Sequence, residues 1–115
     1  MSDLTIRELQ ERAHKTAIEH GWWTGERNVG ELIALMHSEL SEALEEWREY
    51  GYVSARRAWE AGAEPKPVGL GAELADCVIR IADFCKHYNL DLAALLEMKM
   101  EYNETRPYRH GGKRA

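Results

Sequence analysis

Two acidic tetrapeptides, Glu39-Leu-Ser-Glu42 and Glu73-Leu-Ala-Asp76, each lie inside a segment with helical apolar spacing. Residues three apart on an α-helix share a face, so each segment presents a pair of carboxylates. If the two helices face each other, the four acids repel unless a cation neutralises them. Mg²⁺ is a hard ion that prefers oxygen ligands, so the pattern predicts a magnesium site, with Mn²⁺ as an alternative ion. A single acidic pair, in contrast, is typical of a solvated helix surface.

Length and composition indicate one globular domain over residues 1–115. The chain has 115 residues, of which 44% are hydrophobic and 30% charged. The net charge of −5 disfavours binding to a nucleic acid polymer. No apolar run approaches the roughly 20 residues that cross a bilayer, and the polar N-terminus lacks the apolar segment of a signal peptide. We expect a cytoplasmic protein with no membrane partner.

Apolar spacing predicts an all-α fold of four to five helices, without strands. The four main helices are expected at about 5–20, 28–50, 69–88 and 91–103, with Asn28 and Asp91 as N-caps. Residues 54–60 have the composition of one or two helical turns. Residues 61–67 are predicted to form a loop because they are rich in Gly and Pro.

The segment 69–88 is apolar over most of its girth, except for one strip that carries Glu73, Asp76, Arg80, Asp83 and His87. Asp83 is expected to pair with Arg80 or to support the acidic site. A helix that is apolar on several sides needs more cover than a four-helix monomer of this length provides. The sequence therefore predicts a C2 homodimer. Both cysteines are expected to be buried thiols, and the core is expected to include Trp47, Met36, Met98 and Met100.

Two further stretches are candidates for ligand contacts. Trp22 and Trp23 are adjacent in a loop, where one is expected to join the core and the other to offer a stacking surface to a flat ligand. The tail from Arg106 onward is basic, contains two glycines and has no acid. Beside an acidic metal site, such a tail suggests phosphate contacts. A disordered, solubilising terminus is an equal alternative.

Together these features resemble the MazG-like family of all-α nucleoside triphosphate pyrophosphatases, which includes dCTP pyrophosphatases and is related to dimeric dUTPases. The resemblance covers about residues 27–113. Its best-matched parts are Glu39-Leu-Ser-Glu42-Ala-Leu-Glu45-Glu46-Trp47, Glu73-Leu-Ala-Asp76-Cys-Val-Ile, Lys99-Met-Glu-Tyr-Asn103 and Arg106-Pro-Tyr-Arg-His-Gly-Gly-Lys113. The chain departs from the family in two places. The gap between the acidic motifs is longer than usual, with the insertion in 52–67, and Arg80 stands where some relatives have Tyr, which leaves its role open.

The resemblance implies hydrolysis of an NTP or dNTP to the monophosphate and pyrophosphate, in nucleotide housecleaning or pool control. Catalysis would depend on one to three Mg²⁺ ions held by the four acids, with Glu42 as the candidate general base. The resemblance also implies a set of nucleotide-binding residues: Lys99, Asn103, Arg106, Arg109, His110, Lys113, Trp22 and Trp23. Of these, a tryptophan would contact the base, and Asn103 would contact the sugar or the base. The implied assembly is a homodimer or homotetramer, the latter a dimer of dimers.

The residues leave two alternatives to such an enzyme. One is a non-catalytic helical scaffold or regulatory module that keeps the fold, which the clustered acids argue against. The other is a carboxylate-bridged di-iron bundle, which usually needs Glu-x-x-His pairs on two helices. Neither acidic tetrapeptide provides such a pair.

Overall fold

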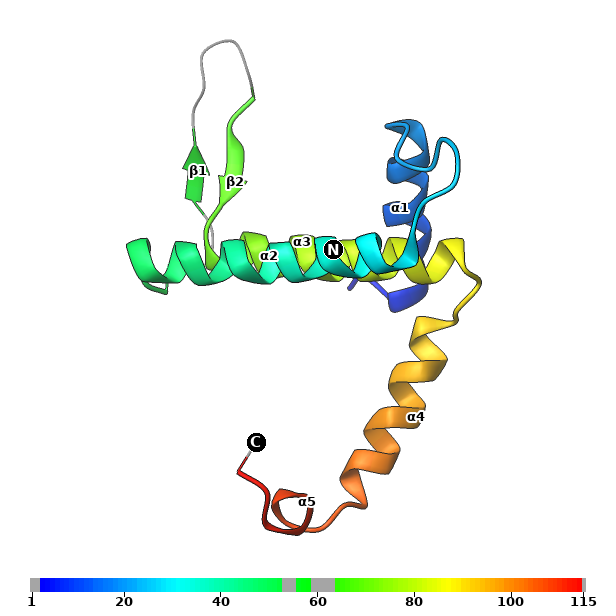
Figure 1. Ribbon diagram of the computed structural model, residues 1–115, viewed down its shortest axis with the longest axis vertical. Helices are drawn as coiled ribbons and strands as arrows, with labels where there is room; N and C mark the ends of the chain where they lie inside the picture. The colour runs from blue at the N-terminus through cyan, green and yellow to red at the C-terminus, as the bar shows by residue number, and fades with distance from the viewer. Residues whose placement is uncertain (1–2, 53–55, 59–63, 115) are drawn as a thin grey trace.

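The computed structural model describes residues 3–52, 56–58 and 64–114, and this part of the chain is mostly helical. Its elements are, in order, α1 (Ile6–Glu19), α2 (Val29–Tyr50), β1 (Arg56–Ala58), β2 (Lys66–Val68), α3 (Leu70–His87), α4 (Leu92–Glu104) and the short α5 (Arg109–Gly112) (Figure 1). The four predicted helices are confirmed, and each of their ends lies within one residue of the predicted position.

The predicted N-caps explain why two of the helices begin where they do. The side chain of Asn28 accepts a hydrogen bond from the Glu31 N–H at 3.1 Å, and that of Asp91 accepts one from the Ala94 N–H at 3.2 Å. Each cap satisfies a backbone donor that the first helical turn leaves without a partner. At its other end α2 stops at Gly51, whose φ of 71° is a left-handed conformation that glycine adopts without strain.

The helices α2 and α3 run antiparallel and side by side, and α1 crosses α3 (Figure 1). Their shared core is small. The buried apolar residues of the described chain are Ala13, Leu32, Ala43, Cys77, Ala82 and Cys85. Both cysteines are free and buried, as the sequence predicted. Burial also raises the pKa of the Cys85 thiol.

The prediction that the chain has no strand was wrong. β1 pairs antiparallel with β2, in a register that places Arg57 opposite Pro67, so the prediction of helical turns fails over 56–58. The remainder of that stretch, 54–55 and 59–60, lies outside the described residues. The predicted loop over 61–67 is wrong at its end, because Lys66 and Pro67 belong to β2, and residues 61–63 lie outside the described part. Strands of three residues are too short to show the alternation that identifies a strand in a sequence. Pro67 is tolerated because a two-stranded ribbon has only edge strands.

The helix α4 leaves the other helices and extends as an arm, with α5 at its far end (Figure 1). The radius of gyration is 16.9 Å, whereas a compact chain of this length has one of roughly 13 Å. The bend before α4 is tied to α1 by the buried Gln10. Its side-chain amide donates to the Leu90 carbonyl at 2.9 Å and accepts from the Leu92 N–H at 3.2 Å.

Many apolar side chains therefore remain exposed in the single chain. No residue of α4 is buried, and Met98 is 63% exposed. The predictions that Trp47, Met98 and Met100 belong to the core were wrong for one chain, because no described element covers these helix faces. The exposed apolar residues of α2, α3 and α4 include Leu40, Leu44, Trp47, Leu74, Val78, Leu95, Leu96, Met98 and Met100.

Candidate metal centre

Packing of α2 against α3 brings acids from the two tetrapeptides together. Glu39, Glu42 and Glu73 each offer a carboxylate oxygen, and these oxygens all lie within 4.8 Å of one another. Glu39 and Glu73 are buried, whereas Glu42 is exposed at the rim. Asp76 lies one turn further along α3 and, with Glu39, lines an adjacent cleft. The predicted approach of the two acidic pairs is thus observed, with three acids in a tight group and the fourth beside it.

The crowding of these acids is visible in their proton affinities. The pKa of Glu73 is raised from 4.5 to about 7, first by burial, then by the hydrogen bond with Glu42 and the negative charges of Glu42 and Asp76, and last by a hydrogen bond with Glu39. The pKa of Asp76 is also raised, by burial and by the charge of Glu39, although Lys66 and Arg80 oppose the shift. A metal-free cluster therefore retains a proton on Glu73 close to neutral pH.

The environment of Glu39 fits a hard divalent cation. Its side chain is only 9% exposed, and its Oε1 accepts a hydrogen bond from Arg80 Nε at 2.8 Å. Its buried Oε2 has no hydrogen-bond donor, which is unusual because a buried anionic oxygen without a partner is costly. Mg²⁺ or Mn²⁺ would supply that partner, and Glu39, Glu42 and Glu73 offer the oxygen ligands that these ions prefer.

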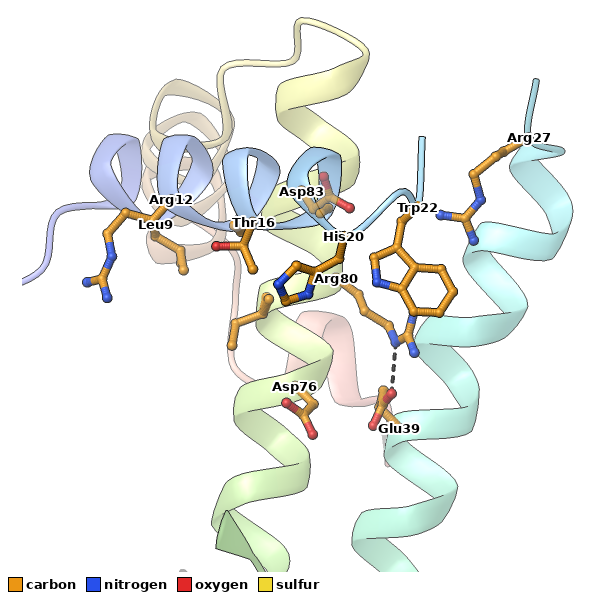
Figure 2. A pocket seen from close by; sticks show the side chains of 13 residues that line it. Leu9, Arg12, Thr16, His20, Trp22, Arg27, Glu39, Asp76, Arg80 and Asp83 are labelled. Carbon is orange, nitrogen blue, oxygen red and sulfur yellow. Dashed lines mark hydrogen bonds and ion pairs between the residues drawn. The ribbon is translucent and has the colours of Figure 1, made fainter. Parts of the chain in front are cut away.

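A cleft of about 450 Å³ opens beside the acids, between α1, α2 and α3. Figure 2 shows Glu39 and Asp76 at one end and Trp22 above them. Trp22 is 62% exposed and lines this cleft. Besides Glu39 and Asp76, the polar and aromatic side chains that line the cleft are Arg12, Thr16, His20, Trp22, Arg27, Arg80 and Asp83.

The sequence predicted a core position for one of the two tryptophans, but Trp23 is half-buried and does not belong to the buried core, whereas Trp22 is exposed. The Trp23 ring stacks on His87 with centroids 3.5 Å apart and planes 7° from parallel. Its indole N–H donates to Asp83 at 2.8 Å, and His14 Nδ1 lies 2.8 Å from the same carboxylate oxygen. Asp83 is therefore occupied by Trp23 and His14, while Arg80 pairs with Glu39 instead. This network joins α1, and the loop that carries Trp22 and Trp23 (the Trp loop), to α3.

The structure does not bring the predicted tail contacts to the acids of the same chain. Lys99 and Asn103 lie on α4, and the later residues lie beyond it at the end of the arm, away from α2 and α3 (Figure 1). The cations of Lys99 and Arg106 instead lie 5.3 and 5.7 Å from the ring centre of Tyr102. Arg109 and Lys113 belong to this distal part, and the side chain of His110 is not among those described.

The cleft contains basic residues that the sequence analysis did not select. Arg12 and Arg27 line it although neither belongs to a motif, and no signal in the sequence distinguished them from other surface arginines. Arg80 lines the cleft as well; the sequence placed it on the same helix face as Asp76, one turn away, and left its role open.

No protein-family model, curated protein or solved structure gave a significant match to this chain. Among the described residues, no helix combines the length and the apolar character that a bilayer crossing needs.

Proposed function

We propose that the protein is a Mg²⁺-dependent nucleoside triphosphate pyrophosphohydrolase of the MazG-like type, which converts an NTP or dNTP to the monophosphate and pyrophosphate. One observation carries the proposal. Two helices place Glu39, Glu42 and Glu73 within 4.8 Å of one another, and the buried Oε2 of Glu39 has no donor. A helical scaffold has no use for such a costly cluster, whereas an enzyme that must neutralise a triphosphate does.

In this proposal Glu39, Glu42, Glu73 and Asp76 hold the divalent cation. When bound, Mg²⁺ supplies charge neutralisation at the phosphates and a more acidic water. Glu42 and Asp76 are both exposed, whereas Glu39 and Glu73 are buried. Glu42 remains the proposed general base, because it is the exposed member of the close group of three acids.

The cleft beside the acids is the proposed nucleoside site. Its volume of about 450 Å³ lies within the range of small-molecule sites, roughly 300–1,000 Å³. Trp22 offers an exposed ring to a base, and Arg27, which also lines the cleft, offers a guanidinium to a phosphate. A nucleotide with its base in the cleft would direct its phosphates toward Glu39 and Asp76.

We also propose that the protein works as a homodimer or a dimer of dimers. The arm α4 exposes Leu95, Leu96, Met98, Met100 and Tyr102, and α2 and α3 expose Leu40, Trp47 and Val78. A second copy presents the same apolar surface and covers it in turn, as a C2 interface requires. The arm would then carry Arg106, Arg109 and Lys113 to the partner's nucleotide site.

Pyrophosphate release from a panel of NTPs and dNTPs with Mg²⁺ tests the proposal. We expect turnover of at least one substrate and a loss of about a hundredfold or more in Glu39→Gln, since even residues that only support a metal ligand contribute 10- to 100-fold. Glu11→Gln, an exposed change on α1, is the matched control. Folded wild-type protein that hydrolyses no nucleotide and binds no Mn²⁺ would refute the proposal in favour of a scaffold.

A further inference from the structure

The side chain of Arg80 reaches from α3 to α2 and occupies one oxygen of the acid cluster (Figure 2). Only its Nε is used, in the 2.8 Å hydrogen bond to Glu39 Oε1. Neither Nη1 nor Nη2 donates to any residue in the described part of the chain. Arg80 is 41% exposed, and it lines the cleft together with Glu39 and Asp76. It thus lies where the proposed metal and nucleoside sites meet.

We propose that Arg80 is a displaceable counter-ion. While the acid site holds no metal, its guanidinium neutralises Glu39. When a divalent cation binds Glu39, the Arg80 side chain moves away and its guanidinium hydrogen-bonds to a phosphate of the substrate. This inference rests on the proposed function, because it assumes that the acids bind the cation. It assigns to Arg80 two successive partners, one in the empty site and one in the loaded site.

Displacement follows from the charges around Glu39. The Oε2 of Glu39 has no hydrogen-bond donor, so a cation could bind it. A divalent ion at Oε2 would lie close to the positive guanidinium of Arg80, which is hydrogen-bonded to Oε1 of the same carboxylate. Like charges at such separations repel strongly inside a protein. Arg80 is the group that can move, because it is partly exposed on a long side chain, whereas Glu39 is buried.

The second partner follows from the shape of the guanidinium and from its position. A guanidinium presents a planar fork of donors that matches two oxygens of a phosphate, and both terminal nitrogens of Arg80 lack a described partner. A ligand that spans the cleft and the acids carries its negative charge at their junction, which is where Arg80 lies. Arg27 lines the same cleft and would act beside it.

Calorimetry on Arg80→Gln tests both halves of the inference, with Mn²⁺ alone and then with inorganic pyrophosphate at saturating Mg²⁺. We expect the variant to bind Mn²⁺ about tenfold more tightly, since a coupling of this kind typically spans 5- to 150-fold. We expect it to bind pyrophosphate about tenfold or more weakly, because a charge-assisted hydrogen bond is lost. Arg48→Gln, which removes the same charge at an exposed position of α2, should change neither affinity.

The outcomes separate this inference from the proposed function. If wild-type protein binds Mn²⁺ and Arg80→Gln binds it equally or more weakly, Arg80 does not compete with the ion and the inference is wrong. Unchanged pyrophosphate binding in the variant also overturns it. Wild-type protein that binds no Mn²⁺ would overturn both.

A measurement on unmodified protein applies even if the variant does not fold. The Nε–H resonance of Arg80, followed by NMR, should shift when Mg²⁺ is added, because the hydrogen bond to Glu39 breaks. The Nη–H resonances should then shift on addition of pyrophosphate. An Nε–H resonance that stays unchanged at saturating Mg²⁺ contradicts displacement.

Discussion

The raised proton affinity of Glu73 predicts that the metal-free protein loses stability as the pH rises. Its pKa is 4.5 in an ordinary setting and about 7 in the folded protein, so the folded state binds the proton more tightly than the unfolded state. The resulting stabilisation is complete below pH 4.5 and disappears as the pH rises through 7. Between pH 5.5 and 8 the free energy of unfolding should fall by about 2 kcal/mol. Asp76, whose pKa is also raised, adds a change of the same sign.

Urea denaturation in EDTA, at fixed protein concentration and at pH 5.5 and 8, measures this difference. Glu73→Gln keeps the shape of the side chain without its charge, so most of the pH dependence should vanish and the variant should be more stable than wild type at pH 8. Glu11→Gln should retain the wild-type dependence, because this glutamate is exposed. A wild-type stability that is constant or rises from pH 5.5 to 8 would refute the reasoning.

Three other predictions concern the metal, the tryptophans and the arm. Mg²⁺ or Mn²⁺ should raise the Tm more at pH 8 than at pH 5.5, because protons compete for the acids, and a shift that survives Glu39→Gln in a thermal melt would contradict this. In urea denaturation, Trp23→Ala should lower the free energy of unfolding by about 3 kcal/mol, because the Trp23 ring stacks on His87. Trp22→Ala should lower the free energy of unfolding by less than about 0.5 kcal/mol and weaken nucleotide binding. Equal losses of stability in the two variants would contradict a structural role for Trp23 and a ligand-binding role for Trp22. Leu95→Lys should shift the sedimentation coefficient of the assembly toward that of a monomer, and an unchanged value would place the interface elsewhere.

The helices and the acid cluster were predictable because their signals are local or periodic. Asn28 and Asp91 identify two helix starts by side-chain chemistry alone. Glu39 and Glu73 are far apart in the sequence, but each belongs to an apolar helix, and such helices pack on each other. The approach of their carboxylates within 4.8 Å follows from that packing.

The features that the sequence did not predict depend on tertiary contacts. The hairpin is held by pairing between strands too short to have a pattern, and the partners of Asp83 come from α1 and the Trp loop rather than from α3. The core assignment of Met98 failed because helical spacing gives the direction of a side chain but not what covers it. The same limit applies to Arg27, whose place in the cleft depends on how α2 begins relative to α1.

The hydrogen bonds of Gln10 connect the N-terminal helix α1 to the bend from which the C-terminal arm α4 begins. One amide satisfies a backbone carbonyl and a backbone N–H on either side of the corner before α4, so the heading of the C-terminal arm is governed from the first helix. Replacing that glutamine with leucine would leave both backbone groups without a partner and weaken the attachment of the arm to α1, while the exposed ion pair between Arg7 and Asp91 at 3.0 Å would remain. The N-terminal helix α1 therefore helps to set the direction of the arm, and with it the position of the basic tail.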